Sequence, residues 1–278
     1  MKTASRSRLA GILFFFATAV SFLLAPRDLA AAPPTGILFR SAAVEGVSYR
    51  YEVYVPEDWT AAKAWPVILF LHGIGHRGVY PPNSSESVLA KLFLGYQKSP
   101  QAIIVFPRCP EDATWIEPRM EKLELTALDQ SIKEFHGDPS RVYLTGLSMG
   151  GYGTWYLASR NPGRFAALAP ICGGVSIPKS VPLPAVSSAA DPYADVAARI
   201  GRIPVWIFHG GADQLIDVTE SRHMAAALRA AGAEVRYTEY PGVGHNSWDR
   251  AYSNPRLLPW LLSKSLRKPA KKQTESRN

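Results

Sequence analysis

The sequence feature with the strongest bearing on the fold is an extended run, apolar in most cases, that recurs along the chain and is followed within two residues by glycine or a polar residue. The first such run, residues 66–71, ends at His72-Gly73. Because its hydrophobicity is continuous rather than alternating, it is typical of a strand buried on both faces of a parallel sheet. Further runs follow at 102–106, 141–145, 165–171, 204–208 and 234–240.

Stretches compatible with helices separate these runs, at 87–96, 121–135, 151–160, 220–231 and 254–266. Alternation of strand and helix predicts an α/β fold with right-handed crossovers. Two extended runs, 37–43 and 48–56, precede it, and the second alternates as a half-buried antiparallel strand does. We therefore predict a mostly parallel twisted sheet with helices on both faces and an antiparallel N-terminal hairpin at one edge.

The N-terminus resembles an export signal. Lys2, Arg6 and Arg8 precede an apolar stretch, 9–24, and the small residues of 29–32 offer a cleavage site. A membrane anchor is the alternative, but a spanning helix needs about 20 apolar residues and this stretch is shorter. We predict a signal peptide over 1–31, a secreted or periplasmic mature protein, and no stable membrane span after cleavage.

The formal net charge of +8 resides in the two ends of the chain. Residues 1–31 carry four basic and one acidic side chain, and residues 264–278 carry six basic and one acidic. A nucleic-acid-binding domain carries its basic residues on a folded face, so we expect no nucleic-acid partner. Residues 32–263 are predicted to form a single domain and 264–278 a basic disordered tail. The oligomeric state is open.

Ser148 lies between Gly146 and Gly150, where the run 141–145 meets a helical stretch. This G-x-S-x-G arrangement at a strand-to-helix turn holds a serine on a sharp bend, and only residues without a Cβ pack two positions on either side of it. The bend exposes the hydroxyl beside the N–H groups that begin the helix. Ser148 is therefore the predicted nucleophile.

A serine nucleophile needs a base and a group that orients the base. His245 follows the last apolar run in a Gly-Val-Gly-His turn, which lets a loop carry the imidazole back over the sheet. Asp213 follows the run 204–208 and is the predicted acid, while Asp217 is an alternative that could equally cap the next helix. The chain order of serine, aspartate and histidine is that of one serine-triad fold and differs from two others.

The oxyanion of such a reaction needs two backbone donors. We predict the N–H groups of Met149, directly after the serine, and of Ile74, in the glycine-containing loop 72–75. The long connection 108–119 contains Arg108 and Trp115, which we expect to border the substrate pocket, although core packing is the alternative for the tryptophan.

Cys109 and Cys172 follow two different apolar runs. In an exported chain they could pair, but the runs need not be neighbours, so two separate buried thiols remain the alternative. Neither cysteine has zinc-ligand spacing, and we expect no metal site and no cofactor.

Four segments, 71–78, 143–155, 170–174 and 240–248, resemble the predicted-peptidase branch of the α/β-hydrolases, which is similar to dienelactone hydrolases, phospholipase/carboxylesterases and feruloyl-esterase-like enzymes. The resemblance covers most of the chain from Tyr49 to Leu262. It implies Ser148, Asp213 and His245 as the triad. His76 stands where relatives usually carry glutamate, and Asp217 where a proline often follows the acid.

The resemblance and the residues together predict an exported serine hydrolase that cleaves carboxylic esters through an acyl-enzyme. Its expected substrate is a small-molecule or polymer-linked ester. Two alternatives stay open, namely a serine peptidase and a non-catalytic binding protein on a hydrolase scaffold.

Overall fold

The structure, a computed structural model, describes residues 34–78 and 87–266. All of them belong to one compact unit of the chain. The predicted signal peptide, 1–31, lies outside the described residues, as does 267–278 of the predicted tail. The predicted domain limits of 32 and 263 therefore stay predictions.

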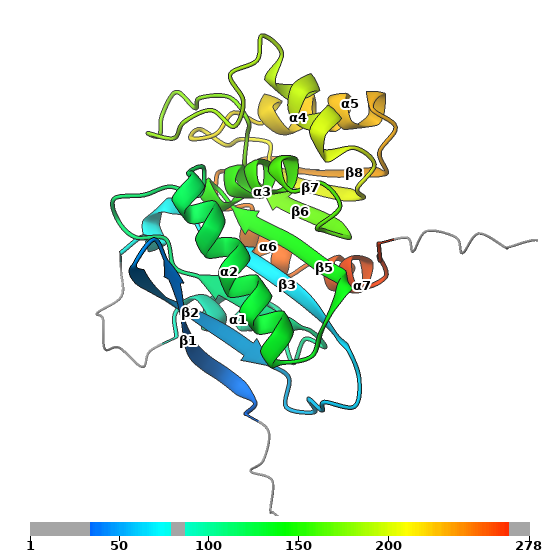
Figure 1. Cartoon of the computed structure of the whole chain (residues 1–278). Helices are drawn as coiled ribbons and strands as arrows, with labels where there is room; N and C mark the ends of the chain where they lie inside the picture. The colour runs from blue at the N-terminus through cyan, green and yellow to red at the C-terminus, as the bar shows by residue number, and fades with distance from the viewer. Residues whose placement is uncertain (1–33, 79–86, 267–278) are drawn as a thin grey trace, which may run out of the picture. The chain divides into compact units, whose positions relative to one another are not determined.

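Eight strands form one sheet in the order β1-β2-β4-β3-β5-β6-β7-β8 (Figure 1). β1 pairs with β2, and β2 with β4, in antiparallel fashion, whereas every other neighbouring pair is parallel. This confirms the predicted α/β fold and its hairpin at one edge. The strands are β1 Gly36–Val44, β2 Val47–Val55, β3 Trp65–Leu71, β4 Ile103–Pro107, β5 Gly137–Leu147, β6 Ala167–Ile171, β7 Val205–Gly210 and β8 Val235–Tyr240.

Helices cover both faces of the sheet, each over its own hydrophobic core (Figure 1). One core is covered by α2 Pro118–Glu134, α3 Met149–Arg160, α4 Pro192–Ile200 and α5 Thr219–Ala230. The other is covered by α1 Leu89–Tyr96, α6 Trp248–Tyr252 and α7 Leu257–Leu262. The continuous apolar runs of β3, β4 and β6 are buried throughout because both of their faces meet a helix layer.

The C-terminal helix differs from its prediction. A helix over 254–266 is wrong, because α7 ends at Leu262 and a separate short helix, α6, precedes it. After α7 the chain turns back onto β5, where Leu266 N–H donates to the Ser140 carbonyl at 2.9 Å and the Tyr143 hydroxyl donates to the Lys264 carbonyl at 2.7 Å. These bonds to β5 place the first residues of the predicted tail, 264–266, against the sheet.

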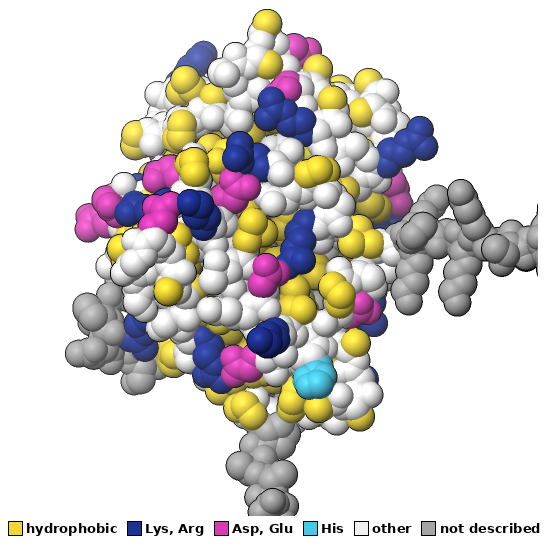
Figure 2. Space-filling view, in the orientation of Figure 1, with side chains coloured by type: hydrophobic (Ala, Val, Ile, Leu, Met, Phe, Trp, Pro, Cys, Tyr) yellow, Lys and Arg dark blue, Asp and Glu magenta, His cyan; other side chains and the backbone are white. Residues whose placement is uncertain are grey.

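No helix among residues 34–78 and 87–266 combines the length and apolar character needed to cross a bilayer. On the face drawn in Figure 2, basic and acidic side chains are interspersed rather than gathered by sign.

Candidate active site

Ser148 occupies the sharp turn between β5 and α3. Its backbone φ of 56° lies in the left-handed region, which is rare for a residue with a side chain and marks local strain. The flanking glycines allow the turn, since a Cβ on Gly146 would lie 2.3 Å from the Gly150 carbonyl oxygen. A Cβ on Gly150 would lie 2.0 Å from the Leu71 carbonyl oxygen at the end of β3. Helix α3 therefore begins in backbone contact with β3.

The structure brings Ser148, His245 and Asp213 together although they are far apart in the chain. His245 Nε2 lies 2.9 Å from Ser148 Oγ, and His245 Nδ1 lies 2.7 Å from Asp213 Oδ2. A carboxylate accepts and cannot donate, so Nδ1 of His245 carries the hydrogen. In that tautomer Nε2 is free to accept the proton of the serine hydroxyl.

Backbone contacts between two loops hold His245 in place. Ala212 N–H, in the turn that leads to the acid, donates to the Val243 carbonyl at 2.9 Å. A Cβ on Gly210 would lie 2.1 Å from the Gly244 carbonyl oxygen, so the loops approach more closely than any other residue allows. The Trp248 ring meets the imidazole edge-on at 5.5 Å between centroids.

The Asp213 carboxylate is buried and surrounded by donors. Its Oδ1 accepts hydrogen bonds from the N–H groups of Leu215, at 2.9 Å, and Ile216, at 3.0 Å. Burial alone raises the pKa of Asp213, but hydrogen bonds from His209, His245 and Ile216 outweigh it and hold the pKa well below its ordinary value of 3.8. The group is therefore ionised at neutral pH.

Asp217 has a different environment. It is exposed, and its Oδ1 accepts from the N–H of Thr219 at 2.9 Å and from the Thr219 hydroxyl at 2.8 Å, at the start of α5. These bonds form a local turn at the start of α5, whose N-cap residue is Val218. The structure thus brings Asp213, and not Asp217, to His245.

The two predicted oxyanion donors each begin a helix. Met149 is the first residue of α3, and Ile74 is the first residue of a 3₁₀ turn, η1 Ile74–His76. The first N–H groups of a helix lack acceptors within that helix. Gly73 brings this loop against the serine turn, because a Cβ there would lie 2.8 Å from Leu147 Cδ1 and 3.7 Å from Ser148 Cβ.

His72 anchors the loop that contains Ile74 from within the core. Its Nδ1 lies 2.8 Å from the Gly73 carbonyl oxygen, and its Nε2 accepts from Cys109 N–H at 3.1 Å. Burial lowers the pKa of His72 to about 3, so the ring is neutral. This histidine joins the end of β3 to the segment after β4.

Trp115 and Arg108 are both buried rather than open to solvent. The Trp115 indole N–H donates to the His72 carbonyl at 2.8 Å and its ring meets the His72 ring edge-on, so the tryptophan packs beneath the predicted oxyanion loop. Arg108 pairs with the buried Glu52 at 2.7 Å. Trp115 is therefore packed against His72, and Arg108 against Glu52, within the core.

Cys109 and Cys172 are free and buried, so the alternative of two separate thiols is the one observed. Burial raises the pKa of both, that of Cys172 to about 12. Neither thiol is therefore ionised to a useful extent at neutral pH.

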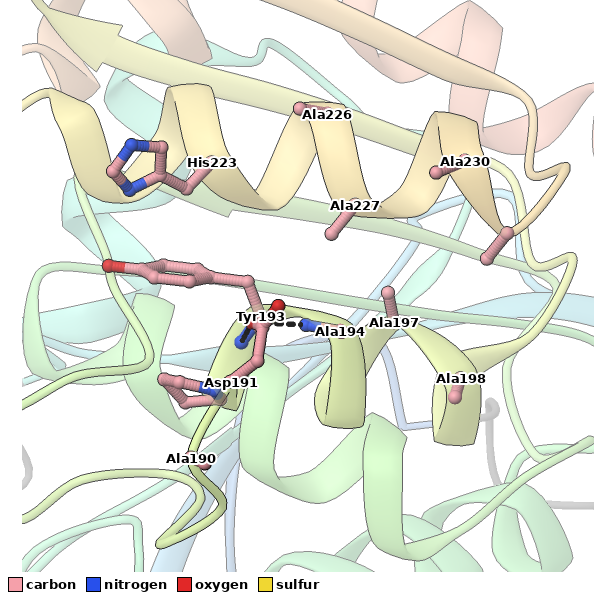
Figure 3. Close-up of a pocket in the computed structure, with 12 residues that line it drawn as sticks. Ala190, Asp191, Tyr193, Ala194, Ala197, Ala198, His223, Ala226, Ala227 and Ala230 are labelled. Atoms are coloured by element: carbon pink, nitrogen blue, oxygen red, sulfur yellow. Dashed lines mark hydrogen bonds between the residues drawn. The ribbon is translucent and has the colours of Figure 1, made fainter.

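Two cavities border helix α5. One, of about 470 Å³, borders the acid turn and is lined in part by Tyr152, Lys179, Asp213 and Glu220. The other, of about 790 Å³, runs between α4 and α5, where mainly alanines line it and the rings of Tyr193 and His223 face one another (Figure 3). Only the first shares a residue with the Ser148 site.

Sequence reasoning missed one residue that contacts the site. His209 lies at the end of β7, and its Nε2 is 3.2 Å from Asp213 Oδ2. The available signal was its position directly before Gly210 at a strand end, four residues ahead of the acid. That signal does not separate a histidine that contacts the acid from one that only fills the core.

The strand order of the sheet and the serine turn between β5 and α3 are those of an α/β-hydrolase. Similarity to an esterase family and to a solved esterase identifies the chain as a carboxylesterase-like hydrolase. Residues 41–257 match the Esterase family, described as "Putative esterase", and the chain belongs to that family. The predicted membership of the esterase-like α/β-hydrolases is thereby confirmed.

Curated relatives match parts of the chain. A stretch of 136 residues is 30% identical to the bifunctional acetylxylan esterase/xylanase of Neocallimastix patriciarum, covering 48% of this chain and 19% of that one. A stretch of 122 residues is 31% identical to poly(3-hydroxyalkanoate) depolymerase C of Paucimonas lemoignei, covering 39% and 28%. An uncharacterized secreted protein of Arthroderma benhamiae is 32% identical over 115 residues, covering 37% and 12%. The chain spans well under two thirds of the length of these relatives.

Solved structures share the fold over most of the chain. A thermostable esterase superposes with a TM-score of 0.67 at 29% identity, covering 82% of this chain and 63% of that one. A ferulic acid esterase superposes with a TM-score of 0.59 at 19% identity, covering 82% and 97%. The second likeness is one of fold alone.

Proposed function

We propose that this protein is an exported serine hydrolase that cleaves carboxylic esters through an acyl-enzyme. The observation that carries the proposal is the unbroken chain of contacts from Ser148 Oγ to His245 Nε2 and from His245 Nδ1 to Asp213 Oδ2. A serine hydroxyl is a weak nucleophile, and a base held at hydrogen-bond distance by a buried carboxylate activates it.

In the proposed reaction, His245 takes the proton of Ser148 as the serine oxygen attacks the ester carbonyl. The oxyanion receives hydrogen bonds from the N–H groups of Met149 and Ile74, and His245 then passes the proton to the departing alcohol. Water attacks the acyl-serine with the same histidine as base and releases the acid. Asp213 stays ionised throughout and stabilises the imidazolium.

The proposed substrate is a small-molecule or polymer-linked ester. Two of the relatives are named for esters of polymers, an acetylxylan esterase and a poly(3-hydroxyalkanoate) depolymerase, which supports this class for the chain. Export to the periplasm or the medium is proposed from the signal-like residues 1–31, and the relative named as a secreted protein supports it.

The test is hydrolysis of p-nitrophenyl acetate and butyrate by the mature protein and by Ser148→Ala. We expect the variant to lose at least about 10³-fold in kcat, because the attacking oxygen is gone. Ser188→Ala, at an exposed serine outside the site, is the matched control and should retain full turnover. Retained turnover in Ser148→Ala would overturn the proposal.

Two further readouts separate the alternatives. A matched p-nitroanilide of the same acyl group distinguishes an esterase from a peptidase, since a peptidase must also protonate a poor amine leaving group. A fluorophosphonate probe should label the wild type at Ser148 and leave Ser148→Ala unlabelled. A wild type that neither reacts with the probe nor hydrolyses esters would indicate a binding protein on the same scaffold.

A further inference from the structure

We propose that His209 is a positioning residue for the acid, and that its close approach to the Asp213 carboxylate shifts the pH range in which His245 works as a base. This proposal rests on the proposed function, because it assigns His209 an effect through Asp213 and His245. The contacts of His209 are to Asp213, Ile216 and Ser221, so any effect on catalysis is exerted through the carboxylate rather than on Ser148.

The contacts of His209 define which ring nitrogen carries hydrogen. Its Nε2 lies 3.2 Å from Asp213 Oδ2 and 3.0 Å from the Ile216 carbonyl oxygen. Both of these oxygens are acceptors only, so Nε2 must be the donor. The ring is fully buried, which leaves no water to take over either contact.

The second ring nitrogen is held by a hydroxyl. His209 Nδ1 lies 2.7 Å from Ser221 Oγ, and Ser221 lies buried in the first turns of α5. A hydroxyl can donate to an unprotonated ring nitrogen. The neutral tautomer with its hydrogen on Nε2 therefore satisfies every contact of the ring and fixes it between β7 and α5.

His209 and His245 share one carboxylate oxygen. Asp213 Oδ2 receives both His245 Nδ1, at 2.7 Å, and His209 Nε2, while Oδ1 receives two backbone N–H groups. Three hydrogen bonds and the 3.2 Å contact from His209 fix the plane of the carboxylate. Each donor also takes up part of its negative charge, so the carboxylate binds the imidazolium of His245 less strongly than it would with His245 as its only side-chain donor.

Other titratable groups surround this pair on the neighbouring elements. Glu239 of β8 is the register partner of His209, but its carboxylate is bound by Arg222 of α5 at 2.7 Å and by the Tyr237 hydroxyl at 2.6 Å. The remaining groups are the Tyr152 hydroxyl of α3, the Cys172 thiol after β6 and the Glu220 carboxylate of α5. Tyr152 and Cys172 are neutral at neutral pH because burial raises their pKa values. The Glu220 carboxylate accepts from Val175 N–H and from the Tyr193 hydroxyl, both at 2.8 Å. His209 is the side chain that contacts the Asp213 carboxylate beside His245.

The test compares the pH profiles of kcat/KM for wild type, His209→Leu and His209→Gln on p-nitrophenyl acetate. In His209→Leu the carboxylate holds the His245 imidazolium more strongly, so the acid limb of the profile should move to higher pH. We expect kcat to fall and KM to change little, because His209 does not touch the substrate. A glutamine amide can donate from near the Nε2 position, so in His209→Gln the acid limb of the kcat/KM profile should lie closer to its wild-type pH.

His223→Gln is the matched control, since His223 is an exposed histidine of α5 outside the site. An acid limb that stays in place in His209→Leu, or that moves equally in His223→Gln, would overturn the role of His209. Failure of the proposed function looks different, because wild type would then show no Ser148-dependent ester hydrolysis at all.

A measurement on the unaltered protein keeps the proposal testable if His209→Leu does not fold. Long-range ¹H–¹⁵N correlation of histidine-labelled protein reports which nitrogen carries hydrogen. We expect His209 with hydrogen on Nε2 and a downfield Nε2–H signal that shifts in Asp213→Asn. Hydrogen on Nδ1 alone, or a signal unmoved by Asp213→Asn, would contradict it.

Discussion

At the scale of single residues, burial separates two aspartates that the sequence left as alternatives. Asp213 is buried and contacts two histidines, whereas Asp217 is exposed and bonds to Thr219. Hydrogen bonds lower the pKa of both carboxyls, so the pKa does not separate them. Residue type and chain position are nearly the same for both. Burial and contacts distinguish the two: Asp213 bonds to His245, and Asp217 bonds to the first residue of α5.

We predict that Asp213→Asn and Asp217→Asn differ sharply in ester hydrolysis. An asparagine at 213 keeps the shape but offers an amide to His245, which favours the wrong imidazole tautomer, and kcat should fall by about 10³-fold or more. Asp217→Asn should change kcat less than about threefold and cost at most about 1 kcal/mol of stability, because asparagine also caps helices. Steady-state kinetics with thermal melts of both variants decide this, and equal losses of kcat would contradict the assignment.

At the scale of elements, the position of the site depends on how closely α3 approaches β3. Gly150 lies where the first turn of the helix meets the carbonyl groups of Leu71 and His72. The contact is between backbones, so no side-chain rearrangement can relieve a clash there. The same contact brings the end of β3, and with it the loop 72–75, next to Ser148.

We predict that Gly150→Ala destabilises the protein by at least about 2 kcal/mol and abolishes ester hydrolysis, since the added Cβ would sit 2.0 Å from the Leu71 carbonyl oxygen. Gly95→Ala is the control, because Gly95 lies in α1 with no other atom within 4 Å of an added Cβ. Alanine there should be neutral or stabilise by up to about 1 kcal/mol. Denaturant unfolding and kinetics test the pair, and a stable, active Gly150→Ala would contradict the close approach.

At the scale of the whole molecule, one buried carboxyl opposes folding. Glu124 of α2 is fully buried, and neither of its carboxyl oxygens has a hydrogen-bond partner among residues 34–78 and 87–266. Burial, with a smaller contribution from the charge of Glu121, raises the pKa of Glu124 well above its ordinary value of 4.5. The carboxyl therefore stays protonated in the folded protein where the unfolded chain would ionise it.

The sign of the pH effect follows from linkage. Below about pH 4.5 both states hold the proton, and above it the unfolded state releases the proton first, so wild-type stability falls as pH rises. We predict that Glu124→Gln is more stable than wild type at pH 8 and that the advantage shrinks toward pH 4, at about 1.4 kcal/mol per unit of pKa difference. Melting temperatures across this range test it, with Glu111→Gln, at an exposed site, as control. A constant difference between the two proteins would contradict the prediction.

Much of the fold followed from local patterns. The apolar runs predicted strands β3, β4, β6 and β7 to within a few residues, because burial on both faces leaves a continuous signal. The run 234–240 predicted β8, an edge strand whose residues are only partly buried. The prediction of a helix over 254–266 was wrong, because hydrogen bonds between β5 and residues Lys264 and Leu266 decide where the helix ends. Such pairing between distant residues leaves no periodic trace in the sequence.

Local sequence patterns are enough to predict the α/β fold, the turn at Ser148 and the residue types of the site, since glycine spacing and hydrophobicity act between near neighbours. The packing in three dimensions is needed to show that Asp213 meets His245, that His209 lies against the Asp213 carboxylate, and that Trp115 and Arg108 are buried. These outcomes depend on where β7, β8 and their loops meet across the sheet. Burial and hydrogen bonding are properties of that assembled geometry, and residue order alone does not contain them.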